Sequence, residues 1–137
     1  MNGYKYYQPN NKDLKDKTGD CQVRALSKAL NLSWLEAFDL TIPICRRMQT
    51  YTIFDGDLDK TIEAMAELGF VYQGISNKKG TKRPTVKSFA AKHKTGTYIL
   101  KIAHHVVACV DGTYYDTWDC GNRSMYGYYE LMQNKEV

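Results

Sequence analysis

Apolar residues recur at helical spacing through the first two-thirds of the chain. Val23, Leu26 and Leu30 fall on one face of a helix, with small alanines beside them. Asp20 stands just before this stripe and is a residue type that favours helix N-caps. The pattern therefore predicts a helix that begins at or next to Cys21.

Two further helices and a short fourth one are predicted before the β-rich part of the chain. Residues 33–36, Ser-Trp-Leu-Glu, match a capping box, and Pro43 is expected to kink or end the helix that follows. The side chains expected to face the interior from this helix are Trp34, Leu35, Phe38 and Ile42. Asp57 or Asp59 can cap the next helix, and Thr85 precedes the short one.

The pattern changes after Gly96 to β-branched and aromatic runs, which predict strands. The predicted strands lie at 70–72, 97–102, 105–110, 113–118 and within 125–131. Helices first and strands after indicate an α+β fold, in which N-terminal helices pack on a C-terminal antiparallel sheet. Residues 1–19 are polar and rich in tyrosine, and we expect them to form an extended arm.

The dipeptide at 111–112, Asp-Gly, is the strongest hairpin signal, because it suits the positive φ angles of a type I′ turn. A two-residue turn at this point pairs Val110 with Thr113. In that register His105 and Asp116 are diagonal neighbours on one face of the sheet, with backbones about 7–8 Å apart. Their polar side chains are then within reach of each other.

A second histidine–aspartate pair exists in the same register. His104 faces Asp119 on the other side of the sheet, and a slip of one residue changes which pair is formed. The residues that these strands offer to a metal are His104, His105, Cys109, Asp116 and Asp119. Their spacing matches no standard zinc pattern, and adjacent histidines on a strand point to opposite faces. Neither a metal nor another cofactor is expected.

Composition indicates one globular domain that spans residues 1–137. This length is common for a single domain, and 43% hydrophobic with 25% charged residues is ordinary for a soluble protein. The longest apolar stretch, 99–110, is interrupted by two histidines and is shorter than the roughly 20 residues of a membrane span. The N-terminus carries no readable secretory signal, so we expect a cytoplasmic location.

The net charge of +4 is a mild excess. Part of it is concentrated in a basic cluster made of Lys78, Lys79, Lys82, Arg83 and Lys87. Such a cluster can hold phosphates, but at this modest net charge a solvated basic loop is the expected interpretation. Nucleic acid is therefore not the expected partner.

The four cysteines form no CxxC pair, so we expect reduced thiols. Cys45, Cys109 and Cys120 are expected to be buried as small hydrophobic residues. Cys21 differs, because unpaired N–H groups and the dipole at a helix start stabilise a thiolate. A nucleophilic cysteine also needs a base and a group that orients the base, and His105 and Asp116 supply both.

Residues 19–25, Gly-Asp-Cys-Gln-Val-Arg-Ala, open the first helix, and residues 105–112 read His-Val-Val-Ala-Cys-Val-Asp-Gly. Tyr-Tyr-Asp-Thr-Trp follows. Over about residues 10–129 this order resembles the papain-like cysteine peptidases, most of all the small members found in bacteria and their phages. The resemblance implies a papain-like fold with the central helix starting at the cysteine. It also implies Cys21 as nucleophile, His105 as base and Asp116 as orienter.

The chain departs from the family at position 15. Papain-like enzymes commonly carry a glutamine six residues before the cysteine, and its side-chain amide forms the oxyanion hole with the backbone N–H of the cysteine. Here that position is Lys15. We expect the Cys21 N–H to be one donor. The candidates for the second donor are Lys15, Gln8, Asn10 and Asn11.

Two functions from different classes follow. The first is a thiol hydrolase that cleaves peptide or related amide bonds through a Cys-His-Asp triad, with a peptide or protein as substrate and, if phage-encoded, the bacterial host cytoplasm as its location. The alternative is a catalytically inactive papain-like fold that binds a protein through a tyrosine-rich surface. The tyrosines available for that surface are Tyr4, Tyr6, Tyr7, Tyr126, Tyr128 and Tyr129. The reactivity of the Cys21 thiol distinguishes the two.

Overall fold

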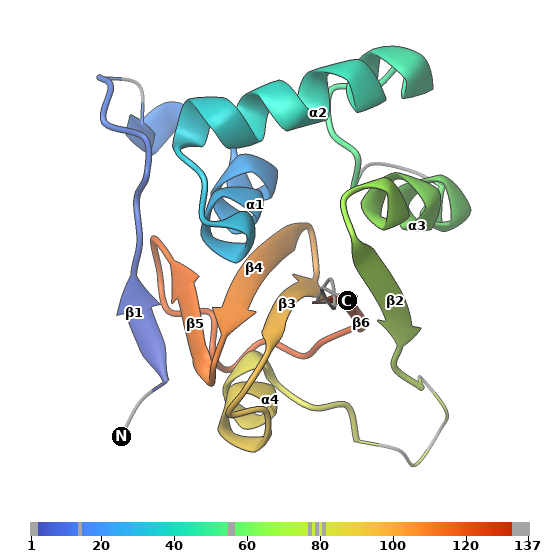
Figure 1. The fold of residues 1–137 in the computed structure, drawn as a ribbon. Helices are drawn as coiled ribbons and strands as arrows, with labels where there is room; N and C mark the ends of the chain where they lie inside the picture. Colours follow the sequence, from blue (N-terminus) through green and yellow to red (C-terminus); the bar gives the residue numbers. More distant parts are fainter. Residues whose placement is uncertain are drawn as a thin grey trace, which may run out of the picture.

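The computed structural model describes residues 3–13, 15–54, 57–76, 78, 80 and 82–132. This part of the chain forms four α-helices, a 3-10 turn and a six-stranded mixed sheet, so the α+β class is confirmed (Figure 1). The helical elements are η1 (Lys15–Lys17), α1 (Cys21–Leu30), α2 (Trp34–Met48), α3 (Leu58–Glu67) and α4 (Val86–Lys92). The strands are β1 (Tyr4–Tyr6), β2 (Phe70–Gly74), β3 (Thr97–Ile102), β4 (His105–Val110), β5 (Thr113–Asp116) and β6 (Gly127–Leu131).

The sheet has the order β1-β5-β4-β3-β6-β2. Every pair is antiparallel except β1 with β5, which is parallel. The prediction of an antiparallel sheet formed by the C-terminal part alone was therefore wrong. The expected arm contributes a strand, because backbone hydrogen bonds at both ends fix it to β5: Tyr114 N–H donates to the Gly3 carbonyl, and Tyr7 N–H donates to the Asp116 carbonyl, both at 2.9 Å.

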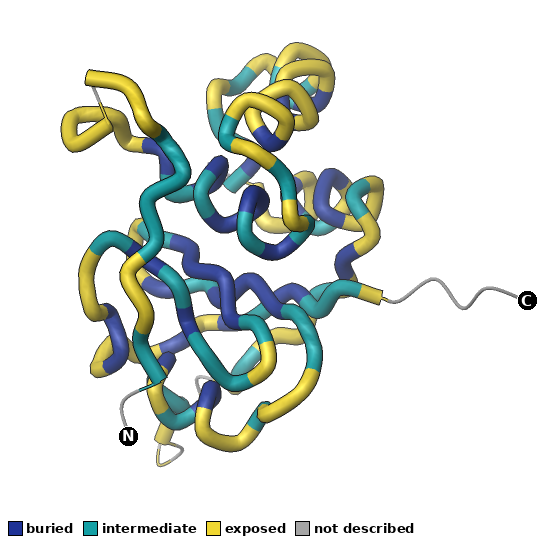
Figure 2. The backbone as a smooth tube through the Cα atoms, turned by 60° about the vertical axis from the view of Figure 1, so that its left-hand side comes forward, coloured by how far each residue is buried: buried dark blue, intermediate teal, exposed yellow. Residues whose placement is uncertain are grey.

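The sheet is covered on both faces, and each face has its own core. Helices α1, α2 and α3 lie over one face, and α4 lies under the other (Figure 1). Strand residues alternate between the two cores: Ile99 and Val106 pack under α1, whereas Leu100 and Val107 pack against α4. Buried residues accordingly line the space between sheet and helices (Figure 2). None of the helices in the described ranges is long and apolar enough to cross a membrane.

The helices begin where the sequence predicted, although the Asp20 side chain makes no capping hydrogen bond at the start of α1. Helix α1 begins at Cys21, Asp57 caps α3 by accepting from the Asp59 N–H, and Thr85 forms a capping box with Ser88 at α4. The position at which each helix begins sets the direction of the helix relative to the preceding loop. For α1 this fixes Cys21 at the end of the helix that faces the β3–β4 turn.

Helix α2 differs from its prediction in two ways. It continues through Pro43, which is exposed, and its buried face consists of Ala37, Thr41 and Ile44. Leu35, Phe38 and Ile42 were expected inside, but Leu35 is 63% exposed and the other two are also exposed. Two of these three buried residues, Ala37 and Thr41, are small. The stripe that includes Trp34, Phe38 and Ile42 instead forms a wall of a pocket.

The hairpin between β4 and β5 has the predicted geometry. Asp111 and Gly112 have φ angles of 50° and 84°, and Val110 pairs with Thr113. The predicted register is therefore confirmed from Val110–Thr113 to Ala108–Tyr115, while the strand ends at Asp116 and not at the predicted residue 118. A second tight turn joins β3 to β4, with His104 at a φ of 53°. This turn places His104 at the tip and His105 at the first position of β4.

Candidate active site

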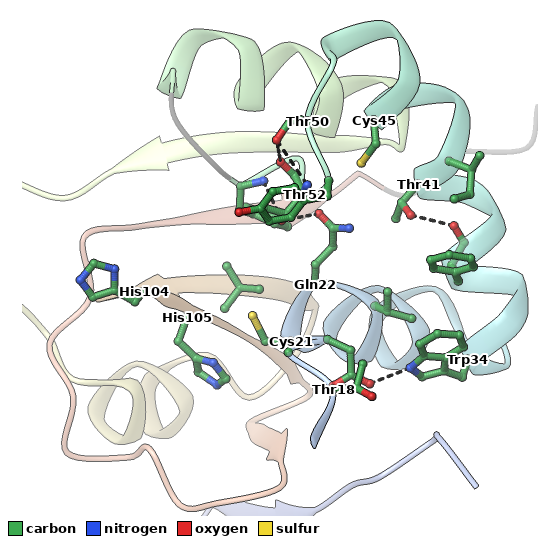
Figure 3. Close-up of a pocket in the computed structure, with 18 of the residues that line it drawn as sticks. Thr18, Cys21, Gln22, Trp34, Thr41, Cys45, Thr50, Thr52, His104 and His105 are labelled. Carbon is green, nitrogen blue, oxygen red and sulfur yellow. Dashed lines mark hydrogen bonds between the residues drawn. The ribbon is translucent and has the colours of Figure 1, made fainter. Parts of the chain in front are cut away.

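A pocket of about 1080 Å³ opens between the start of α1, the long helix α2 and the β3–β4 turn. Figure 3 shows Cys21 and His105 side by side at its base, on α1 and β4. Gln22, the next residue of α1, points away from them and accepts hydrogen bonds from the Thr52 hydroxyl at 2.8 Å and the Ile53 N–H at 2.6 Å. Gln22 therefore fixes the loop after α2 rather than acting on the thiol.

Cys21 is the first residue of α1, where backbone N–H groups lack helical acceptors. Burial raises the pKa of the Cys21 thiol, but hydrogen bonds from the His105 ring and the Val106 N–H, with the charges of His105 and Arg24, outweigh it. The pKa of Cys21 is consequently lowered from its ordinary value of 9.0. The site favours the thiolate, which is the nucleophilic form.

His105 links the thiol to a carboxylate. Its Nε2 lies 2.5 Å from the Asp116 Oδ2, which leaves Nδ1 as the ring nitrogen available to Cys21. Burial lowers the pKa of His105, but the hydrogen bonds and charges of Asp116 and Cys21 raise it to about 9. The ring also packs against Trp118, with centroids 5.2 Å apart. The two pKa shifts therefore have the directions that favour an imidazolium–thiolate pair.

Asp116 is held by donors on both oxygens. Its side chain is 2% exposed, and its Oδ1 accepts from Arg24 at 3.2 Å and from the Thr117 N–H at 2.8 Å. Its Oδ2, which faces His105, also accepts from the Cys120 thiol at 3.7 Å. These contacts fix the carboxylate plane, so Asp116 can set the orientation and the tautomer of the histidine ring.

Arg24 belongs to this network, although the sequence pattern did not single it out. It lies one turn after Cys21 on α1 and forms ion pairs with Asp20 and Asp116, both almost fully buried. Asp20 in turn accepts from the Trp34 indole N–H at 2.7 Å. The signal in the sequence was the spacing of four between Asp20 and Arg24, which suits a helical ion pair. The partner on β5 could not be inferred from that spacing.

The structure does not bring the rival pair together. His104 is exposed at the tip of the β3–β4 turn, on the rim of the pocket. Asp119 Oδ1 instead accepts from the Tyr114 hydroxyl at 2.6 Å and from the Gly121 N–H at 2.9 Å. The physical reason is the positive φ at His104, which turns it away from the strand geometry that would set it opposite Asp119.

Lys15, predicted as an oxyanion donor, lies exposed on η1 and does not line the pocket. The other candidates are not at the pocket either: Gln8 Oε1 accepts from the Asn10 N–H at 3.1 Å, and Asn10 Oδ1 accepts from the Lys12 N–H at 2.9 Å. Asn11 does not line the pocket. Of the predicted oxyanion donors, the one located at the site is the Cys21 backbone N–H, at the helix start.

Cys109 and Cys120 are buried as predicted, whereas Cys45, which was also expected to be buried, is not. Burial raises the pKa of Cys109 and of Cys120 to about 12. Cys45 is half-buried, and burial raises its pKa although Gln22 donates a hydrogen bond to it. Cys45 lines the same pocket as Cys21, which makes it an internal reference for thiol reactivity. Among the described residues, no group of three or more His, Cys, Asp or Glu side chains is placed to hold a metal ion.

The described residues of the basic cluster do not line this pocket. Arg83 packs its guanidinium over the Tyr126 ring at 4.7 Å, and Lys87 lies on α4, on the opposite face of the sheet. Lys79 falls outside the described residues.

No family model, curated protein or solved structure matches the chain. The chemistry of the site is therefore argued from its own geometry.

Proposed function

We propose that the protein is a papain-like cysteine peptidase that hydrolyses peptide or related amide bonds. One observation carries the proposal: Cys21, at the start of α1, shares a pocket with His105, whose Nε2 lies 2.5 Å from the buried Asp116 carboxylate. A thiol at a helix start, a base beside it and a carboxylate behind the base make up the arrangement that nucleophilic catalysis by cysteine requires.

In the proposed reaction, the Cys21 thiolate attacks the carbonyl carbon and forms a tetrahedral intermediate. The C–N bond then breaks, and the His105 imidazolium gives its Nδ1 proton to the departing amine. Neutral His105 next takes a proton from water, whose oxygen attacks the thioester and releases the acid. The C–S bond breaks, Cys21 leaves as the thiolate and His105 keeps the proton from water, so the enzyme ends as it began. Asp116 keeps the ring in position throughout.

Negative charge on the carbonyl oxygen needs donors close to the sulfur. The Cys21 N–H is at the first position of α1, where the helix dipole also favours an anion. Loss of one donor of this kind typically slows such reactions about 10²–10³-fold. Since Lys15 is remote from the pocket, we propose that the helix start provides the main stabilisation of the oxyanion.

A degenerate peptide library tests the proposal without knowledge of the substrate. Wild-type protein is incubated with the library, and new peptide termini are identified by mass spectrometry. We expect cleavage that disappears in Cys21→Ala and persists in Cys45→Ala, because Cys45 lines the same pocket but has a raised pKa. Cleavage that survives in Cys21→Ala would exclude the proposed nucleophile.

A further inference from the structure

Lys101 lies in the same pocket as Cys21 without a role in the proposed chemistry. It belongs to β3 and pairs with Val106 of β4, so the two side chains leave the same face of the sheet, the face that α1 covers. The side chain is half-buried, and its ammonium donates a hydrogen bond to the Ile102 carbonyl at 2.7 Å. This contact uses one of its three N–H donors.

The pocket has no free acidic group among its described lining residues. Asp20 is the acidic side chain in this lining, and it is buried and held by Arg24 and Trp34. The lining also includes the cation Arg46, besides Lys101. Burial lowers the pKa of Lys101, although the nearby Cys21 works in the opposite direction. A half-buried ammonium is costly unless an anion accompanies it, and no described carboxylate does so.

The thiolate is not the main partner of this ammonium. The groups that lower the pKa of Cys21 are His105, the Val106 N–H and Arg24. Lys101 is not among these groups, although the charge of Cys21 acts on its ammonium. Its remaining N–H donors are therefore available to a group that enters the pocket.

We propose that Lys101 binds a carboxylate of the substrate close to the bond that is cleaved. This inference rests on the proposed function, because it takes the ligand to be a peptide substrate. It adds a preference for an acidic peptide. The carboxylate comes from an Asp or Glu side chain or from the C-terminus of a short peptide. Either source supplies acceptor oxygens for a charge-assisted hydrogen bond to the ammonium.

Matched alkylating probes test the inference at Cys21 without the need for turnover. Acetyl-Glu-Gly chloromethyl ketone is compared with acetyl-Gln-Gly chloromethyl ketone, which has the same shape and no charge. Iodoacetate is compared with iodoacetamide as a small terminal carboxylate. Second-order rate constants for modification of Cys21 are measured by mass spectrometry, and each pair is expressed as the ratio of charged to neutral probe.

We expect the Lys101→Met ratio to fall by about tenfold from the wild-type ratio for at least one pair, in line with a charged hydrogen bond. A fall for the Glu and Gln pair identifies a side chain as the source, and a fall confined to iodoacetate identifies a terminal carboxylate. Lys101→Arg is expected to keep the ratio, and Lys101→Glu to favour a probe with lysine in place of glutamate. Arg46→Met is the control, since this exposed cation lines the pocket elsewhere.

Equal ratios in wild type and Lys101→Met for both pairs would overturn the inference, as would an equal fall in Arg46→Met. The neutral probe in each variant reports the thiolate itself, so a change in Cys21 reactivity cancels in the ratio. The two proposals can therefore fail separately. A Lys101-dependent ratio without peptide cleavage contradicts the peptidase alone, and cleavage with a ratio independent of Lys101 contradicts the carboxylate site alone.

Discussion

Arg24 and Asp116 are 92 residues apart in the sequence, and the Arg24 Nη2 lies 3.2 Å from the Asp116 Oδ1. This ion pair joins the helix that carries Cys21 to the strand that carries the partner of His105. The ion pair therefore fixes the start of α1 relative to β5. In the proposed mechanism Arg24 is a positioning residue, because it contacts Asp116 and does not line the pocket.

Replacement of Arg24 by Met is expected to destabilise the fold by about 3–5 kcal/mol, because it leaves the buried Asp20 and Asp116 without their cation. Urea unfolding measures this change. Arg47→Met is the control, because the pair of Arg47 with Glu67 is exposed and should contribute at most about 1 kcal/mol. A loss below about 1 kcal/mol for Arg24→Met would show that the pair does not hold the two elements together.

Asp116→Asn is expected to bring the pKa of His105 down from about 9 toward its ordinary 6.5, because the hydrogen-bond geometry is retained while the charge that favours the imidazolium is removed. NMR titration of the histidine ring signals measures the shift. His93→Ala and His104→Ala identify the signals of the other two histidines, so the remaining signal belongs to His105. An unchanged His105 titration in Asp116→Asn would mean that Asp116 is not the group that raises this pKa.

The rates of peptide cleavage and of Cys21 alkylation are expected to respond differently to high pH. The thiolate, once formed, persists as pH rises, so alkylation by iodoacetamide does not fall. The imidazolium loses its proton near pH 9, and without that proton the amine cannot be protonated as it leaves, so cleavage declines there. The two rates are followed from about pH 5 to about pH 10.5 on the same preparation. Cleavage that keeps rising beyond about pH 10 would contradict the role of His105 as proton donor.

Gly121→Ala is expected to destabilise the protein by about 1–3 kcal/mol, as overpacking of a core does. A Cβ at this position would overlap the hydroxyl of the fully buried Tyr114 and lie 2.9 Å from the Asp119 Oδ1, which accepts from that hydroxyl. Thermal unfolding gives the change. Gly19→Ala is the matched control, because a Cβ on Gly19 would meet nothing within 4 Å. A Gly121→Ala variant as stable as Gly19→Ala would show that Tyr114 can move.

Local patterns predicted the elements that position the site, and long-range pairing was not visible in them. The Asp-Gly turn at 111–112 sets the register along β5, and from it alone His105 and Asp116 were placed within reach. The parallel pairing of β1 with β5 was not predicted, because the sequence of a three-residue strand does not indicate a partner strand more than 100 residues away. The inner face of α2 was misassigned because it includes the small residues Ala37 and Thr41, whereas several large apolar side chains of this helix are exposed.

The same limit applies to the electrostatics of the site. Arg24 is visible in the sequence as a helical partner of Asp20, but its contact with Asp116 depends on how α1 lies across the sheet. Lys15 was predicted from its distance to the cysteine in sequence, and the exposed η1 turn carries it away from the pocket. Lys101 could not be predicted at the site, since a lysine in a strand ordinarily faces water.

The rate of Cys21 alkylation by iodoacetamide as a function of pH, in wild type and in His105→Ala, tests the central claim most directly. We expect the wild-type rate to stay on a plateau well below pH 9.0, the ordinary thiol pKa, and the plateau to vanish in His105→Ala, with the modified residue located by mass spectrometry. The same titration curve in both proteins, with a midpoint at an ordinary thiol pKa, would contradict an assembled Cys21–His105 pair.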